Sequence, residues 1–199
     1  MSTGPITADF DLAGMVRVRV VGGDAEIAAV ARQLGPLRCE VGGEPDISIE
    51  VVDRLPDDGR LRHLGRDEAG FTDDGFVVMR AKAKSRARVR IPFDRIGRAG
   101  GRCVITCEPG LPAVPLLIPI LAVTALAKGL VPLHAGAFEW NGTGVLVTGW
   151  SKGGKTETLI ATTQRGARYV GDEWCYIDPE RQLVVGIPEP VTLWAWHLR

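Results

Sequence analysis

The strongest constraint on the fold is the segment of residues 149–156, which reads Gly-Trp-Ser-Lys-Gly-Gly-Lys-Thr. It has the G-x-x-x-x-G-K-[ST] spacing of a P-loop, in which backbone N–H groups surround phosphate oxygens. The apolar run at residues 145–147 predicts a strand before the loop, and residues 157–163 predict a helix after it. The chain therefore has to form an α/β unit in which a strand, a glycine loop and a helix follow one another.

Each position of the loop has an expected role toward a nucleoside triphosphate. Lys155 would reach the β- and γ-phosphates, and the Thr156 hydroxyl would coordinate Mg²⁺. The other positions expected to cradle phosphate are Gly149, Ser151, Lys152, Gly153 and Gly154. Lys152 either adds a second cation to the cradle or points to water, and the sequence favours neither. We expect ATP and Mg²⁺ to be the cofactors.

An acidic pair follows the next predicted strand, at residues 168–170. We expect that strand to end at the same sheet edge as the P-loop strand, which would bring Asp172 and Glu173 to the phosphates. Mg²⁺ prefers carboxylate support, and transfer to a hydroxyl needs a positioned base. One acid would hold Mg²⁺, directly or through water, and the other would accept the hydroxyl proton; we expect Asp172 to be a metal ligand and both Asp172 and Glu173 to be catalytic. A solvated turn at a strand end is the alternative.

His134 lies in an apolar run, residues 132–140, that we expect to form one strand. Asn141-Gly142 and a second strand at residues 144–148 follow, and Asn-Gly between two such runs predicts a β-hairpin. His134 would then lie beside the P-loop strand. A catalytic histidine and a histidine satisfied within the core are equally supported interpretations.

Residues 133–136, 144–156 and 165–173 together resemble the catalytic domain of the HPr kinase/phosphorylase family, over about residues 116–190. The resemblance implies a P-loop kinase domain with a mixed sheet and a core similar to that of phosphoenolpyruvate carboxykinase. It implies transfer of phosphate from ATP, with Mg²⁺, to a serine or other hydroxyl of a protein, peptide or small molecule. It also places Lys155, Asp172, Glu173 and His134 at the transfer site.

Three features depart from the family pattern. Glu173 stands where a second aspartate is usual, and Lys152 stands where a small residue is common. The chain ends before the Glu-x-Arg-Gly-like segment of a full member, so we expect the kinase domain to be C-terminally incomplete. The alternative to a kinase is a catalytically weak nucleotide-binding or ATPase module that reports ATP to a partner.

Residues 1–110 are expected to form a small α+β module, ahead of a P-loop domain at residues 111–199. The patterns predict strands at residues 15–21, 47–52, 75–80, 86–91 and 103–107. They also predict helices at residues 24–33, capped by Asp24, and 116–128, ended by Gly129.

Basic residues occupy every second position of residues 82–90, and they are Lys82, Lys84, Arg86, Arg88 and Arg90. This face is either a solvated sheet edge or a surface for an acidic protein, a phosphopeptide or an anionic small molecule. It contains no stacking aromatic residue, which argues against single-stranded nucleic acid. Trp194 and Trp196 indicate core packing, or an interface with further C-terminal residues or with another subunit of a homo-oligomer.

Composition limits the partners and the compartment. Lys plus Arg and Asp plus Glu number 24 each, so the summed charge predicts no nucleic-acid or membrane-surface binding. The apolar run at residues 111–131 is interrupted by three prolines and Lys128, so we expect no membrane span. The four cysteines are scattered, without neighbouring ligands for zinc, and residues 1–5 show neither the basic start nor the apolar run expected of a signal peptide. We therefore expect a cytoplasmic protein with reduced thiols.

Overall fold

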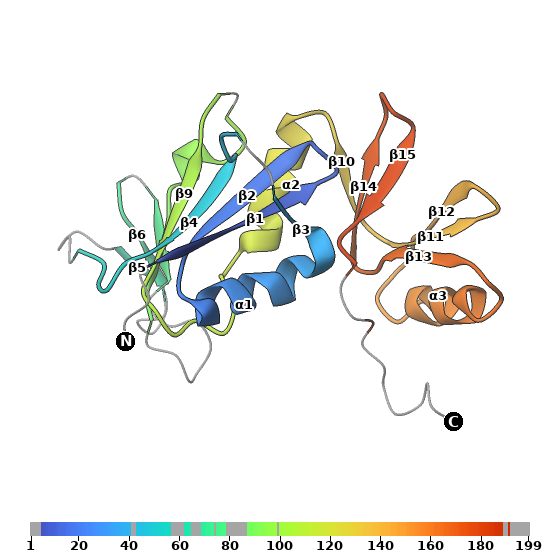
Figure 1. Cartoon of the computed structure of the whole chain (residues 1–199), viewed down its shortest axis with the longest axis horizontal. Helices are drawn as coiled ribbons and strands as arrows, with labels where there is room; N and C mark the ends of the chain where they lie inside the picture. Colours follow the sequence, from blue (N-terminus) through green and yellow to red (C-terminus); the bar gives the residue numbers. More distant parts are fainter. Residues whose placement is uncertain are drawn as a thin grey trace. The chain divides into compact units, whose positions relative to one another are not determined.

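The computed structural model describes residues 5–40, 43–56, 62–64, 69–73, 75–78, 87–98, 100–188 and 191. The chain divides into two compact units, one made of Met1–Gln33 and Arg38–Lys128, the other of Leu34–Leu37 and Gly129–Arg199 (Figure 1). The boundary thus lies after Lys128 rather than after residue 110. The reason is that helix α2 (Leu117–Ala127) packs against strand β2 (Val16–Gly22) of the first unit.

The first unit contains a mixed sheet with the strand order β3-β1-β2-β4-β9-β8-β7-β6-β5 in its described part. Strands β2, β4 and β9 run parallel, and the other pairs are antiparallel. The remaining strands are β1 (Ile6–Leu12), β3 (Arg38–Cys39), β4 (Ile47–Val51), β5 (Arg62–Leu64), β6 (Ala69–Phe71), β7 (Phe76–Val78), β8 (Val89–Ile91) and β9 (Cys103–Cys107). A single-turn helix, η2 (Phe93–Arg95), belongs to this unit, whereas η1 (Gly35–Leu37) belongs to the second.

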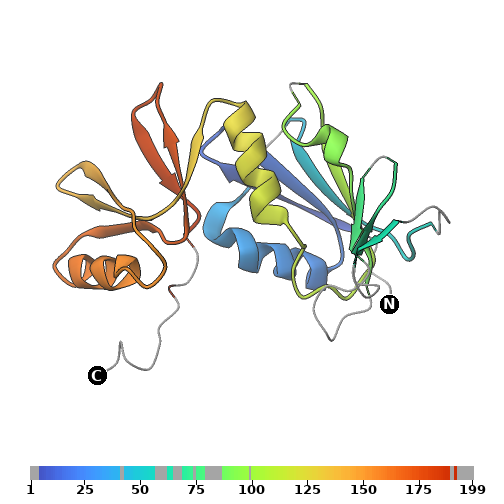
Figure 2. The same cartoon turned by 180° about the vertical axis from the view of Figure 1, so that it is seen from behind.

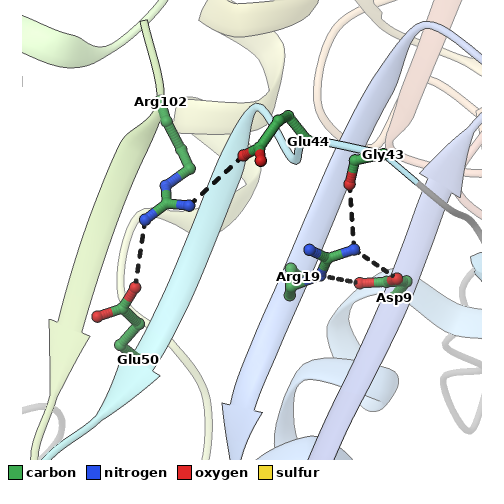
Figure 3. Close-up of polar contacts among 6 residues, drawn as sticks. All are labelled: Asp9, Arg19, Gly43, Glu44, Glu50 and Arg102. Atoms are coloured by element: carbon green, nitrogen blue, oxygen red, sulfur yellow. Dashed lines mark hydrogen bonds and ion pairs between the residues drawn. The ribbon is translucent and has the colours of Figure 1, made fainter.

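Alternation along the strands separates the two faces of this sheet. In β2 the valines 16, 18 and 20 are fully buried, while the intervening arginines are half-buried. Helices α1 (Asp24–Leu34) and α2 cover the apolar face (Figure 2). The opposite face carries ion pairs, such as Arg19 Nε to Asp9 Oδ1 at 2.8 Å (Figure 3).

Both predicted helices of this region are confirmed, and α2 ends at Ala127, two residues before Gly129, whose φ is +89°. At the start of α1, the Glu26 carboxylate accepts the N–H of Gly23, a capping role expected of Asp24. Lys82, Lys84 and Arg86 lie outside the described residues. Arg88 is no solvated edge residue, because it bonds the Glu108 carboxylate at 2.8 Å.

The second unit contains two three-stranded sheets in its described part, with the orders β10-β14-β15 and β12-β11-β13. Every pairing in both sheets is antiparallel. The strands are β10 (Val131–His134), β11 (Gly136–Trp140), β12 (Thr143–Val147), β13 (Arg168–Gly171), β14 (Trp174–Asp178) and β15 (Leu183–Gly186). Helix α3 (Lys155–Thr163) packs on β11 and β13, and the buried Leu159 joins it to Phe138 and Ala167.

The structure corrects the prediction of a single strand over residues 132–140. The chain changes sheets at Ala135, so β10 pairs with β14 while β11 pairs with β12 and β13. The Asn141-Gly142 hairpin is confirmed, since both residues have positive φ, +52° and +81°. His134 therefore lies on β10, outside the hairpin that leads into the P-loop.

The two small sheets of the second unit come into close contact at Gly186. A Cβ built on Gly186 of β15 would lie 2.4 Å from the carbonyl oxygen of Val170 and 2.9 Å from the Gly171 Cα in β13. Because these are backbone atoms, no side-chain movement could relieve such a contact. The absence of a side chain at Gly186 thus lets β15 approach β13, the strand that leads to Asp172.

Among the residues that the structure describes, no helix combines the length and the apolar character needed to cross a lipid bilayer. Trp194 and Trp196 lie outside the described residues.

Candidate active site

The loop between β12 and α3 takes a conformation that its glycines make possible. A Cβ at Gly153 would lie 2.9 Å from the Trp150 carbonyl oxygen, which accepts the Gly153 N–H at 3.0 Å. Gly154 precedes α3 with a φ of +86°, a value that strains residues bearing a Cβ. The loop closes on itself and starts the helix directly, as a P-loop requires.

Lys155 is a buried cation without a carboxylate partner among the described residues. It is only 7% exposed, and its Nζ contacts the carbonyl oxygens of Gly149 and Trp150, each at 3.3 Å. Both contacts exceed the 2.7–2.9 Å usual for charge-assisted hydrogen bonds. Burial of an ammonium group is costly unless an anion compensates it. The loop thus holds a positive charge where an anion would complete the site.

Thr156 and Asp172 join the start of the helix to the end of strand β13. The Thr156 hydroxyl donates a hydrogen bond to Asp172 Oδ2 at 2.9 Å, and Asp172 is 7% exposed. Strands β12 and β13 are both antiparallel to β11, so they run in the same direction and end at the same edge. The expected meeting of these two strand ends is thus present in the structure.

Glu173 occupies a strained backbone conformation. Its φ is +69°, and the Trp174 N–H donates to the Asp172 carbonyl oxygen at 2.8 Å, which corresponds to the rarer form of γ-turn. The Glu173 N–H donates to Asp172 Oδ1 at 3.0 Å, and its carbonyl accepts the Ala135 N–H at 3.2 Å. Such strain persists only where the surroundings enforce it, and it concentrates at functional sites.

His134 reaches the acidic pair from β10. Its Nδ1 lies 3.4 Å from Glu173 Oε2, and the two side chains are 48% and 55% exposed. The Trp174 ring packs edge-on with its centroid 6.1 Å from that of the imidazole. His134 is therefore neither buried in the core nor on the P-loop hairpin, and it lies in contact with Glu173 at an open surface.

The structure brings most of the predicted site residues together. Thr156, Asp172, Glu173 and His134 form one set connected by these contacts, and Lys155 precedes Thr156 in the chain with its Nζ on the loop carbonyls. Lys152 instead is exposed at a φ of +63° and makes no ion pair with the described residues. Its side chain thus lies at the solvent side of the loop.

Comparison with known proteins adds no relative. No family model, no curated protein and no solved structure matches this chain. The chemistry of the site is therefore argued from its own geometry.

The oxygen donors present fit Mg²⁺ held jointly with phosphate. Among the described residues there is no cluster of three or more His, Cys, Asp or Glu side chains that could enclose a metal. Mg²⁺ is commonly bound by one or two carboxylates together with substrate phosphates. Asp172 and the Thr156 hydroxyl, one residue from Lys155, supply such a partial set.

Three features were not predicted. A turn at Glu173 was offered only as the alternative, and its positive φ had no sequence signal, because a positive φ is common for glycine and asparagine but not for glutamate. Trp150 is 90% exposed within the loop. Strand β14 was also missed, although the alternation in Trp-Cys-Tyr-Ile-Asp could have indicated it.

Proposed function

We propose that this protein is an ATP- and Mg²⁺-dependent kinase that transfers phosphate to a hydroxyl group of a protein, peptide or small molecule. The observation that carries the proposal is the buried Lys155 ammonium beside the Thr156–Asp172 pair, an ammonium that has no carboxylate partner in the part of the chain that the structure describes. A triphosphate would supply the missing negative charge, and the hydroxyl–carboxylate pair would supply metal ligands.

The site's own residues divide into a binding half and an acceptor half. Lys155 and the loop N–H groups bind and orient phosphate, and the N-terminus of α3 adds a favourable dipole. Asp172 and Thr156 hold Mg²⁺, which when bound neutralises charge on the phosphates. The Lys155 and Asp172 side chains are buried and Thr156 is half-buried, whereas loop residues 149–153 are exposed to solvent.

The acceptor half is open. Glu173 Oε2 takes the proton of the incoming hydroxyl, and His134 Nδ1, 3.4 Å away, orients that carboxylate. An acceptor can reach both groups because about half of each side chain is exposed. The strained turn at Glu173 fixes the base relative to Asp172, since its N–H is bonded to the Asp172 carboxylate.

Labelled phosphate transfer tests the proposal. The full chain would be incubated with γ-labelled ATP, Mg²⁺ and candidate hydroxyl acceptors, beginning with the proteins and peptides encoded beside its gene. We expect Glu173→Gln to keep nucleotide binding while transfer falls by about 10² or more, the usual contribution of a general base. Lys155→Met should lose nucleotide binding. Glu180→Gln, an exposed carboxylate of the same unit, is the matched control and should retain both.

Each other outcome identifies an alternative. Nucleotide binding without transfer to any acceptor would contradict the kinase and favour an ATP-reporting module. Phosphate release without an acceptor would indicate an ATPase. Transfer that is equally fast in Glu173→Gln would remove the assigned base.

A further inference from the structure

The first unit contains a cavity of about 260 Å³ that the proposed kinase chemistry does not use. Its walls come from the segment before β4, the glycine-rich segment before β9 and the C-terminal end of α2. The lining includes five charged residues, which are Glu44, Asp46, Arg98, Arg102 and Lys128. This volume suits a ligand smaller than most cofactors.

The walls of this cavity are held in place by specific contacts. Gly97 has a φ of +66°, and a Cβ there would lie 3.2 Å from Val123 in α2, so its backbone rests directly on the helix. Lys128 Nζ bonds Asp46 Oδ1 at 2.6 Å and the Met15 carbonyl at 2.7 Å. Asp46 also accepts the Arg17 N–H at 2.9 Å. Asp46 and Lys128 are therefore structural, with their charges already compensated.

The other charged groups of the lining are weakly partnered. The Arg98 side chain is exposed and makes no ion pair or hydrogen bond with the residues that the structure describes. Arg102 lies 3.7 Å from both Glu44 and Glu50, as Figure 3 shows, which is too long for a charge-assisted hydrogen bond. The Glu44 side chain is 90% exposed. Arg98 thus has no charged partner among the described residues, whereas Arg102 and Glu44 form a long ion pair with each other that a ligand would have to separate.

We propose that this cavity binds a free α-amino acid as its zwitterion. Arg98 and Arg102 would bind the carboxylate, since guanidinium groups match carboxylate geometry. Glu44 would bind the ammonium group, and the C-terminal end of α2 adds a partial negative charge on that side. An anion alone would meet Glu44 and the helix end, and a cation alone would meet two arginines. A ligand with both charges satisfies the whole lining.

Binding of free L-amino acids to the full chain, measured one at a time by calorimetry, tests this inference. We expect at least one to bind saturably, and its N-acetyl and carboxamide derivatives to bind about tenfold more weakly, because each removes one charged contact. Arg98→Gln, Arg102→Gln and Glu44→Gln should each weaken binding by a similar factor. Arg95→Gln, an exposed arginine of the same unit outside the lining, should bind like the unaltered protein.

Three results would overturn the inference. They are the absence of binding for every amino acid tested, equal binding of the singly charged derivatives, and unaltered binding by Arg98→Gln. Thermal unfolding of each variant checks that the fold is kept. Because the P-loop belongs to the other unit, nucleotide binding should not change in these variants, and failure here leaves the proposed kinase function intact.

Discussion

The hydrogen bond between Thr156 and Asp172 can be tested through its effect on stability. Thr156→Val keeps the side-chain shape and removes the hydroxyl that donates to Asp172 Oδ2 at 2.9 Å. The acceptor is a carboxylate that is only 7% exposed, so the bond belongs to the charge-assisted class, worth about 1.5–3 kcal/mol. Asp172 would keep the Glu173 N–H as a hydrogen-bond donor to its carboxylate. We expect Thr156→Val to lower the free energy of unfolding of the second unit by about 2 kcal/mol.

Tryptophan fluorescence during urea unfolding is a suitable assay. The five tryptophans are Trp140, Trp150, Trp174, Trp194 and Trp196, and all follow Gly129. The fluorescence emission therefore reports on unfolding of the second unit. Its unfolding transition can be fitted as a two-state process to give the free energy of unfolding.

Thr158→Val is the matched control on the same helix. Its hydroxyl donates to the Gly154 carbonyl oxygen at 2.8 Å, but the residue is exposed and its acceptor is neutral. Loss of that bond should cost at most about 0.5 kcal/mol, as expected for an exposed surface position.

A double-mutant cycle decides whether the pair itself is responsible. In an Asp172→Ala background, Thr156→Val should cost about 0.5 kcal/mol or less, which gives a coupling energy near 1.5 kcal/mol. The reasoning is refuted if Thr156→Val costs no more than Thr158→Val, or if its cost is the same with and without Asp172. Either result would remove the metal-ligand pair on which the proposed function depends.

Three further predictions concern packing, pH and thiol chemistry. Gly186→Ala should destabilise the second unit by about 2–3 kcal/mol in urea unfolding, whereas Gly144→Ala, whose Cβ would lie 3.4 Å from Val184, should be nearly neutral. Burial raises the pKa of Glu108, but hydrogen bonds from Arg88 and from the Leu55 N–H outweigh it, so the net pKa is lowered. The ionised Glu108 therefore stabilises the folded protein above a pH of about 4.5, and this stabilisation is lost as the pH falls through the lower pKa of the folded state. Glu108→Gln should be less stable than the unaltered protein at pH 7 and equally stable in strong acid. Burial, and secondarily the charge of Asp172, raises the pKa of Cys175 to about 12, so iodoacetamide at pH 8 should alkylate it only after unfolding, as mass spectrometry of alkylated peptides would show.

Local patterns predicted much of the fold. The loop at residues 148–154, its flanking strand and helix, the Asn-Gly hairpin, both helices of the first unit and the β2 and β9 strands were each expected from short-range signals. These elements depend on periodicity, caps and turn residues that lie within a few positions of one another. For Lys155 and Thr156, the motif itself specifies where the side chains lie, so their positions followed directly.

Long-range pairing accounts for most of what was missed. The boundary between the units depends on which strand α2 packs against, and the sequence of residues 111–128 does not specify that strand. Strand β1 shows weaker apolar alternation than β2 and was overlooked, although it is the antiparallel partner of that strand. The basic run was interpreted as one face, whereas Arg88 is held by Glu108, twenty positions along the chain. No local signal specifies such a partner.

The location of the candidate site follows from the two points where the chain changes between the small sheets. It passes from β10 to β11 at Ala135, and it returns from β13 to β14 through Asp172 and Glu173. These crossings are bonded to each other, since the Ala135 N–H donates to the Glu173 carbonyl and the Cys175 thiol donates to the Ala135 carbonyl. Where the chain crosses, its backbone is not part of either sheet's hydrogen-bond ladder, which allows the positive φ at Glu173. The crossing also brings His134, at the end of β10, into contact with Glu173, which follows β13 of the other sheet. The strain at Glu173 is thus tied to the same geometry that gathers the candidate acceptor groups, and a single continuous strand over residues 132–140 could not have placed His134 there.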